Sequence, residues 1–264
     1  MTTYSSQTLA CCIYCAVVLL MFYMIDHFQN INHEAYLEFI HIPKTGGSTI
    51  ENVAKENGVL WGANNKTSFS DAYKDSTPKQ MCMKTNNNPV PHHIPPKYLN
   101  DDSPYSNNDT FCVIREPLER VVSEYNFLYN KQQDTDDYFT ANKLNYWIEN
   151  AINREDHITG DSSRITHGQC HLLPQYDYVY DDNGNITCDN PLDFAYLTQS
   201  FNALMDKHDE LKSIKISPTR VDNKSIHKLS VKDISNENLV KLKRIYQKDI
   251  ELYDRIHQQH TSVF

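Results

Sequence analysis

The segment YLEFIHIPKTGGSTIENVAKENG, residues 36–58, constrains the fold more than any other part of the sequence. Its first part is short and mostly apolar, which is typical of a buried strand in a parallel sheet. Pro43 ends that strand, and Gly46 and Gly47 permit a tight turn that side chains would obstruct. Apolar residues then recur at helical spacing up to Gly58, which predicts a helix ending there. A glycine turn between a strand and a helix is an arrangement that can bind an anion at the helix start.

The start of this helix is the predicted anion site. Its backbone amides lack partners within the helix, and Lys44 adds a full positive charge beside them. A nucleotide loop of the GxxxxGK[ST] type would place the lysine after the glycines, whereas here it precedes them. This order, and the lack of an apolar segment ending in a magnesium-binding aspartate, disfavour the alternative of a P-loop phosphotransferase or NTPase. The residues whose amides would hold the anion are Thr45, Gly46, Gly47, Ser48 and Thr49.

The composition fits one globular domain. The chain has 264 residues, of which 39% are hydrophobic and 22% charged, enough for one sizeable core. Its formal net charge of −9 argues against a protein that mainly binds nucleic acid, because such proteins need a surplus of basic residues. A local basic cleft on an acidic body can still bind a small anion.

The N-terminal segment LACCIYCAVVLLMFYMI, residues 9–25, contains no charged residue and is just long enough to span a membrane. A cleaved signal peptide is disfavoured because no basic residue precedes the segment and no small-residue cleavage site follows it. A buried core helix is disfavoured because the segment lacks a polar face. We expect residues 1–8 to be a short tail, 9–25 a transmembrane signal anchor, 26–35 a short stem and 36–264 the catalytic domain. The flanking charges leave the orientation of the anchor open.

Four cysteines outside the anchor suit disulfides in an oxidising compartment: Cys82, Cys112, Cys170 and Cys188. Of the three pairings that four cysteines allow, we expect Cys170–Cys188, because a short excursion with an Asn183-Gly184 turn lies between them. Cys112 lies in an apolar run and is expected to remain a buried thiol. Four glycosylation sequons are compatible with the same compartment: Asn65, Asn108, Asn185 and Asn223.

A second strand, loop and helix are predicted in FCVIREPLERVVSEYNFLY, residues 111–129. FCVI reads as a buried strand, and Pro117 suits the first turn of a helix. The spacing of Arg115, Arg120 and Ser123 allows guanidinium groups and a hydroxyl to surround one anion. Arg120 alone fits an ion pair at the helix start equally well.

Two adjacent histidines, His92 and His93, lie in the proline-flanked segment PHHIPPKYL, residues 91–99. The prolines exclude a regular helix and fix the backbone locally. Because a neutral imidazole is the most common general base for a hydroxyl group, either histidine is a candidate base.

These segments, in this order, resemble the Golgi-type membrane-bound carbohydrate sulfotransferases, including the heparan sulfate and chondroitin enzymes. Those enzymes transfer a sulfonyl group from 3′-phosphoadenosine 5′-phosphosulfate (PAPS) to a sugar. HIPKTGGST resembles their 5′-phosphosulfate loop, RxPxxRxxS their 3′-phosphate loop, and PHHIPP their WHxPP element. The resemblance aligns His93 with the general base and His92 with the usual tryptophan. It implies a P-loop-like α/β fold, with a central, mainly parallel sheet flanked by helices and donor loops at the carboxyl ends of the strands.

The resemblance also implies roles for single residues. Lys44 would stabilise the leaving group, and Arg115 and Ser123 would hold the 3′-phosphate, with no metal required. His171 and Gln175, in CHLLPQ, would reach the acceptor sugar or serve a structural role. Further donor contacts would come from Lys224 and Ser225, in a loop that lies near the nucleotide in the family. Ala195 stands where members carry an acid, which weakens the case for a catalytic carboxylate there.

The expected protein is therefore a PAPS-dependent O-sulfotransferase of the Golgi membrane. It would be single-pass and type II, with a lumenal catalytic domain and a glycosaminoglycan or glycoprotein sugar as acceptor. An alternative of a different class is a catalytically silent, membrane-tethered glycan-binding protein.

The remaining periodicity predicts further elements. Helices are expected over residues 144–151 and 201–211, and strands over 176–180 and 214–216. Ser235 is expected to cap one last helix that continues to Tyr253.

Overall fold

The computed structural model describes residues 37–65, 69, 90–129, 139–152, 170–220, 222 and 229–263. They belong to one compact unit, Leu37–Phe264. The expected tail, anchor and stem, residues 1–35, lie outside the described residues, as do Lys224 and Ser225. Within the described ranges, no helix is both long and apolar enough to cross a membrane.

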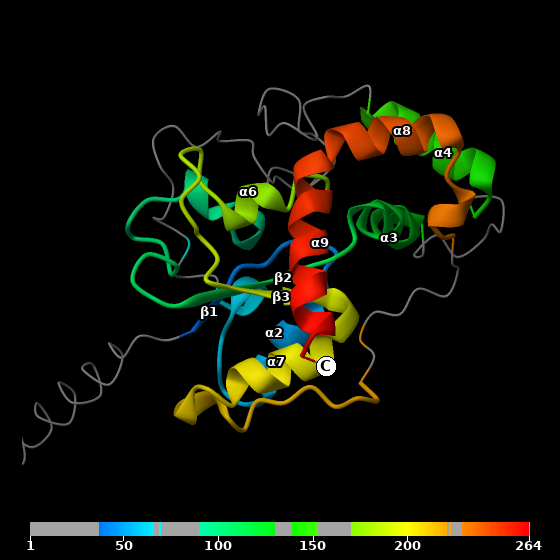
Figure 1. Cartoon of the computed structure of the whole chain (residues 1–264). Helices are drawn as coiled ribbons and strands as arrows, with labels where there is room; N and C mark the ends of the chain where they lie inside the picture. Colours follow the sequence, from blue (N-terminus) through cyan, green and yellow to red (C-terminus); the bar gives the residue numbers. More distant parts are fainter. Residues whose placement is uncertain are drawn as a thin grey trace, which may run out of the picture. The chain divides into compact units, whose positions relative to one another are not determined.

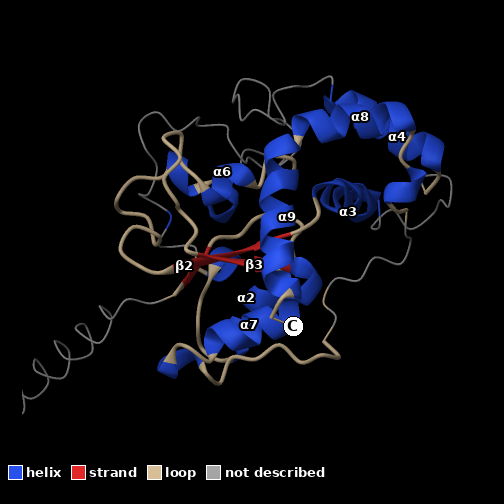
Figure 2. Ribbon diagram, viewed as in Figure 1, coloured by secondary structure: helices blue, strands red, loops and turns tan. Residues whose placement is uncertain are grey.

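Among the described residues, three parallel strands form the sheet, in the order β1-β2-β3 (Figure 1). Figure 2 shows β2 and β3 in red among the blue helices. These are β1 (Glu38–Phe39), β2 (Thr110–Ile114) and β3 (Asn190–Asp193). In the register of the sheet, Phe111 pairs with Phe39 on one side and with Asn190 on the other. Every residue of β2 is buried, as expected of a central strand covered on both faces. The structure confirms an α/β fold with a small parallel sheet.

Helices cover both faces of the sheet, and alternate residues of β2 show which helix covers which face. Phe111 and Val113 pack in one cluster with α2 (Gly47–Glu56) and α7 (Leu197–Met205). Cys112 and Ile114 pack in another with α6 (Tyr176–Val179) and α9 (Gln247–Thr261). In Figure 1, α2 and α7 lie below the strands and α9 runs across them.

A third apolar cluster joins α3 (Pro117–Tyr129), α4 (Ala141–Ile152) and α8 (Asn236–Ile245). Leu144 and Ile148 are fully buried on the predicted face of α4. In the part of the chain that the structure describes, the other helical elements are short 3-10 turns: η2 (Gly62–Asn64), η4 (Pro91–His93), η5 (Pro96–Tyr98), η7 (Phe194–Tyr196), η8 (Asp209–Leu211) and η9 (Val231–Asp233).

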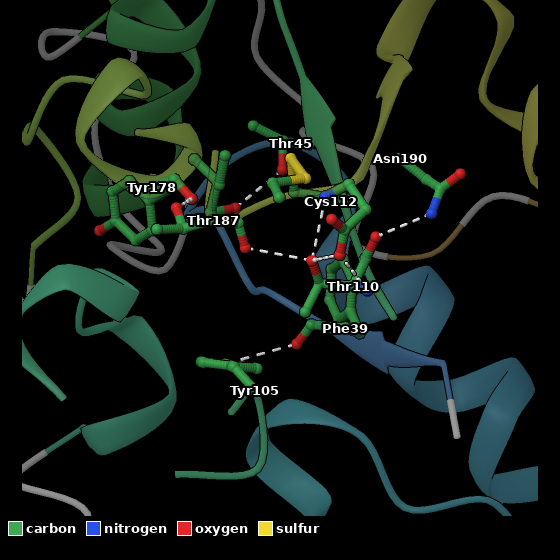
Figure 3. Close-up of a disulfide and its surroundings, with 11 residues drawn as sticks. Phe39, Thr45, Tyr105, Thr110, Cys112, Tyr178, Thr187 and Asn190 are labelled. Carbon is green, nitrogen blue, oxygen red and sulfur yellow. Dashed lines mark hydrogen bonds between the residues drawn. A yellow bond between two sulfur atoms is a disulfide. The ribbon is translucent and has the colours of Figure 1, made fainter. Parts of the chain in front are cut away.

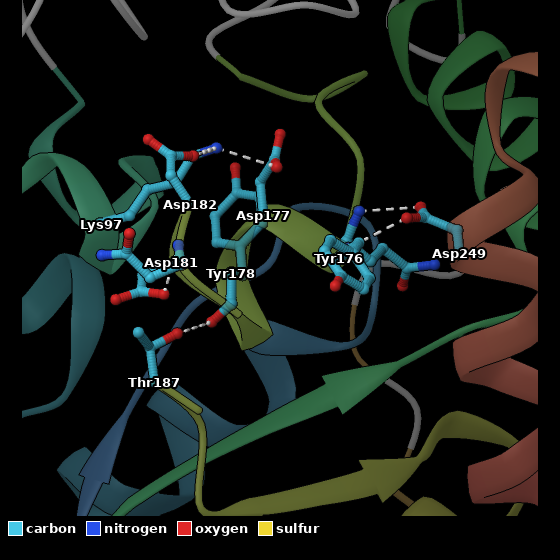
Figure 4. Close-up of polar contacts among 10 residues, drawn as sticks. Lys97, Tyr176, Asp177, Tyr178, Asp181, Asp182, Thr187 and Asp249 are labelled. Atoms are coloured by element: carbon cyan, nitrogen blue, oxygen red, sulfur yellow. Dashed lines mark hydrogen bonds and ion pairs between the residues drawn. The ribbon is translucent and has the colours of Figure 1, made fainter. Parts of the chain in front are cut away.

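The predicted strand over residues 176–180 is wrong, because most of this segment is the short helix α6. The Asp249 carboxylate accepts hydrogen bonds from the backbone amides of Gln175 and Tyr176, at 2.8 and 2.9 Å (Figure 4). An anion at a helix start stabilises the helix, and this one comes from α9, far away in the sequence. Within residues 176–180, Tyr180 alone makes a β-bridge, and its partner is Ile186.

Two further predictions are wrong. The last helix is interrupted at Tyr246, so that Ser235 caps α8 and α9 follows as a separate helix. Residues 214–216 are not a strand. The Asn202 side chain instead binds both backbone polar groups of Ile216, at 2.8 and 3.0 Å, which replaces the pairing that a strand would provide.

Cys188 forms a disulfide with Cys112, so the expected Cys170–Cys188 pair and the free Cys112 thiol are both wrong (Figure 3). Cys170 is itself disulfide-bonded. The expected pairing relied on proximity in sequence. The parallel pairing of β2 with β3 instead brings Cys112 and Cys188, 76 residues apart, to a Cα–Cα distance of 6.3 Å. Beside them, the Thr110 hydroxyl donates to the Thr187 carbonyl at 3.1 Å and further ties β2 to this segment.

Candidate functional site

A cleft of about 940 Å³ opens at the carboxyl ends of the strands. The segments that follow all three strands line it: Lys44 follows β1, Arg115 follows β2 and Phe194 follows β3. Ligands of open parallel sheets bind at this edge, because the connecting loops converge there. The cleft is therefore the candidate functional site.

The glycine turn places the start of α2 in the cleft wall. Gly46 caps the helix with a φ of +93°, and a Cβ there would lie 3.0 Å from a Leu197 methyl carbon. None of the described side chains caps α2, and its first turn contains no acidic residue. Four of the predicted loop residues line the cleft: Gly46, Gly47, Ser48 and Thr49. The helix start therefore faces the cleft as an anion site without a competing carboxylate in its first turn.

Thr45 is the exception among the loop residues. Its side chain is fully buried, and its hydroxyl donates to the Ile42 carbonyl at 2.8 Å. The Thr45 side chain thus binds the backbone of its own loop and does not line the cleft.

Lys44 has a φ of +71°, a left-handed conformation that residues with a Cβ rarely adopt. Its ammonium nitrogen lies 3.6 Å from the centroid of the Phe127 ring, on α3. Burial lowers the Lys44 pKa to about 8, with Glu124 opposing this shift and Arg115 and Arg120 adding to it. Lys44 thus carries a poorly solvated charge into the cleft, where it can stabilise an anion strongly.

Arg115 is held in place by several contacts, but its guanidinium group can still bind a ligand. One Nη1–H donates to the Lys44 carbonyl at 3.2 Å, and the guanidinium lies 4.5 Å from the Phe194 ring centroid. Its Nε is buried without a hydrogen-bond partner among the described residues, and Glu119 is 3.6 Å away from it. A buried nitrogen without a partner is costly unless a ligand satisfies it. Ser123, on α3, lines the same cleft.

Gln175 clamps the Arg115 backbone. Its side-chain amide donates to the Arg115 carbonyl at 2.8 Å and accepts from the Arg115 N–H at 3.0 Å. Gln175 is fully buried and does not line the cleft. Its contacts therefore fit the structural role that was the alternative to contact with the acceptor sugar.

Arg120 also supports the site from behind. It is buried, and it donates to the carbonyls of Pro43, at 3.0 Å, and His171, at 2.8 Å. Its contacts join the loop after β1 to the segment before α6. Both are to backbone carbonyls, so among the described residues Arg120 does not make the ion pair that the sequence offered as the alternative to ligand contact.

Three histidines lie in a row along the cleft. His93 is in the middle, with ring centroids 4.7 Å from His41 and 5.2 Å from His171. Tyr178 fixes the backbone of His93 by donating to its carbonyl at 2.8 Å. His92 packs against His93 at 4.3 Å but does not line the cleft.

Each outer histidine of this row is paired with a buried glutamate. The Nδ1 atom of His41 lies 2.6 Å from the Glu51 carboxylate, and that of His171 lies 2.8 Å from Glu124. A carboxylate at Nδ1 keeps a proton on that nitrogen and leaves Nε2 as the reactive one. Histidine–carboxylate pairs of this kind are typical of enzyme sites.

The cleft thus contains two groups of residues that could bind anions, and a row of three imidazoles. A model described as the sulfotransferase family matches residues 29–254 of the sequence. The chain belongs to the sulfotransferase family. No curated protein and no solved structure matches it. The family match confirms the resemblance drawn from the motifs of this sulfotransferase.

Sequence reasoning missed several residues of the sulfotransferase site: His41, Glu51, Glu124 and Phe127. His41 had a usable signal, because it is a polar residue within the apolar run predicted to be a buried strand. Glu51 had none, since the helical spacing marked only its apolar neighbours. Glu124 and Phe127 had none, since their place in the cleft depends on how α3 packs. Lys224 and Ser225 lie outside the described residues, although Asp222 and Ser230 on either side of them line the cleft.

Proposed function

We propose that this sulfotransferase moves a sulfonyl group from PAPS to a hydroxyl group of a glycan. The observation that carries the proposal is that two groups of residues able to bind anions line one cleft, together with His93. The start of α2 with Lys44 forms one region, and Arg115 with Ser123 forms the other. A donor with phosphate groups at both its 5′ and 3′ positions suits this arrangement.

The first region would bind the 5′-phosphosulfate. In the transfer, the bond between sulfur and the bridging oxygen breaks while a new bond forms between sulfur and the sugar oxygen. Negative charge grows on the departing 5′-phosphate, which leaves as part of adenosine 3′,5′-bisphosphate. Lys44 and the amides of Gly46, Gly47 and Ser48 would stabilise that charge, since they are fixed in place before the reaction. The predicted amides of Thr45 and Thr49 are left out, because Thr45 does not line the cleft and the Thr49 N–H donates to the Gly46 carbonyl at 3.0 Å.

His93 would accept the proton that the sugar hydroxyl loses. The imidazoles of His41 and His171, each paired with a carboxylate, lie on either side of it. Arg115 and Ser123 would hold the 3′-phosphate through charge-assisted hydrogen bonds, which distinguishes PAPS from adenine nucleotides lacking that group.

We further propose a Golgi location, with residues 9–25 as a type II anchor and the catalytic domain in the lumen. The Cys112–Cys188 disulfide supports an oxidising compartment. The acceptor would be a glycosaminoglycan or a glycoprotein sugar. Phe127, 41% exposed at the cleft, offers an apolar surface for a sugar ring.

The test is to incubate the full chain with PAPS labelled in its sulfonyl group and a panel of desulfated glycosaminoglycans and N-glycans. We expect transfer to at least one glycan and none from ATP labelled in its γ-phosphate. His93→Ala should lower turnover far more than His92→Ala, its matched neighbour. Phosphate transfer from ATP, or no transfer to any glycan, would contradict the proposal.

A further inference from the structure

We propose that His41, His92 and His93 form a binding site for a divalent transition-metal ion, and that zinc is the ion that fits it. One ring nitrogen from each histidine lies within 4.8 Å of the others. His41 follows β1, whereas His92 and His93 belong to the turn η4, so two separate segments supply the ligands.

The distances are close to those of a zinc site. Zinc–nitrogen bonds of about 2.0–2.1 Å in a tetrahedron put the ligand nitrogens roughly 3.4 Å apart. The three rings already touch, with centroid distances of 4.3, 4.7 and 5.4 Å. The nitrogens, which lie within 4.8 Å of one another, would have to approach to roughly 3.4 Å, and rotation of the rings is the movement that can close the site around an ion.

Glu51 orients the first ligand as a carboxylate does in zinc proteins. Its 2.6 Å hydrogen bond to His41 Nδ1 leaves Nε2 to bind the ion. The carboxylate is itself fixed by the Ala63 amide, at 2.9 Å, and it is only 6% exposed. The Glu51 carboxylate therefore lies directly behind the ligand.

Two glycines make room for the pair of His41 and Glu51. A Cβ on Gly62 would lie 2.0 Å from Glu51 Oε1, and a Cβ on Gly47 would lie 2.3 Å from His41 Nε2. Side chains at either position would displace the carboxylate or cover the nitrogen that binds the ion. The space at Nε2 thus depends on Gly47, which lines the cleft together with His41.

The ligand set selects the kind of ion. Three imidazoles suit zinc and similar transition metals, whereas magnesium and calcium require oxygen ligands. Three protein ligands leave a fourth position for water or another small ligand. Because His41 and His93 line the cleft, that position would face it.

The test uses the full chain, freed of metal with a chelator, and zinc chloride as the titrant in calorimetry at neutral pH. We expect one saturable site per chain for zinc and none for magnesium. His92→Ala and His93→Ala should each weaken zinc binding more than about 100-fold, because each removes a direct ligand and the loss of an outer-shell partner already costs about 10–100-fold. His208→Ala, in a histidine outside the cluster, should leave it unchanged.

His41→Ala would leave the buried Glu51 without its partner and could prevent folding, so Glu51→Gln is the second variant. It keeps all three ligands and should weaken zinc binding about 10–100-fold. Cobalt in place of zinc should give the visible absorption of a four-coordinate site, lost in His92→Ala. Absence of saturable binding at micromolar zinc, or equal binding by the wild type and both histidine variants, would overturn the proposal. The measurement does not require sulfonyl transfer, so it can fail independently of the proposed function.

Discussion

The ammonium nitrogen of Lys44 lies 3.6 Å from the centroid of the Phe127 ring, which ties the loop after β1 to the helix that carries Ser123. An aromatic face stabilises a cation without neutralising it, unlike a carboxylate. Lys44 therefore keeps its positive charge available to a ligand while its position in the cleft is fixed. The charge of this residue is the first feature to test.

Lys44→Ala should lower the turnover number about 10²–10³-fold, the usual effect of removing one group that stabilises transition-state charge. The measurement is transfer of labelled sulfonyl from PAPS at saturating substrate. Lys55→Ala, at an exposed position of the same helix α2, is the matched control and should keep wild-type turnover. Near-normal turnover of a folded Lys44→Ala protein would remove Lys44 from the mechanism.

The rate should also depend on pH through Lys44. Burial lowers its pKa to about 8, so kcat/KM should fall as pH rises through that value and the charge is lost. Lys44→Arg stays charged, so its residual activity should lack this decline. The unfolded chain keeps the lysine proton up to about 10.5, so between about 8 and 10.5 it binds more protons at this site than the folded protein. The contribution of Lys44 to stability therefore rises with pH there, and thermal unfolding at each pH separates loss of charge from loss of fold.

Arg115→Ala should reduce the preference for PAPS over adenosine 5′-phosphosulfate, which lacks the 3′-phosphate. Hydrogen bonds to charged groups contribute about 1.5–3 kcal/mol, so the ratio of kcat/KM for the two donors should fall roughly 10–100-fold. Arg244→Ala, at an exposed position of α8, is the control. An unchanged ratio in Arg115→Ala would place the 3′-phosphate elsewhere.

The sequence predicted the loops at the ends of β1 and β2 because each consists of neighbouring residues with strong local preferences. The helix starts at Gly47 and Pro117 lie where the glycine pair and the proline indicated them. The role of Gln175 could not be predicted, because it depends on contacts with Arg115 and Asp249, 60 and 74 residues away. The same limit explains the misassigned strand at α6.

The Cys112–Cys188 disulfide also joins residues far apart in the sequence, and its pairing can be tested. Digestion without reduction should yield one peptide pair linked through Cys112 and Cys188, identified by mass spectrometry. Cys188→Ala combined with Cys112→Ala should lower the free energy of unfolding by about 2–4 kcal/mol, because the unfolded chain loses the constraint of a long closed loop. A linked peptide containing Cys170 and Cys188 would instead support the pairing favoured by sequence proximity.

If the zinc site and the proposed transfer are both correct, zinc should inhibit the enzyme. Binding would occupy His93 and prevent it from accepting the proton of the hydroxyl. Transfer should fall on addition of micromolar zinc and recover on chelation. His92→Ala, normalised to its own rate without zinc, should need a far higher zinc concentration for the same inhibition. Equal zinc sensitivity in His92→Ala and the wild type would show that inhibition occurs at another site.

The chain of contacts from Asp249 through Gln175 to Arg115 has a consequence for biosynthesis. The Asp249 carboxylate accepts a hydrogen bond from the backbone N–H of Gln175. The Gln175 side chain in turn binds both the backbone N–H and the carbonyl of Arg115. During translation, Arg115 is synthesised more than a hundred residues before Asp249, so its main chain lacks this support until the start of α9 has left the ribosome. A nascent chain therefore presents an incomplete cleft and, on the proposed function, binding of PAPS would indicate that synthesis of the domain is nearly finished.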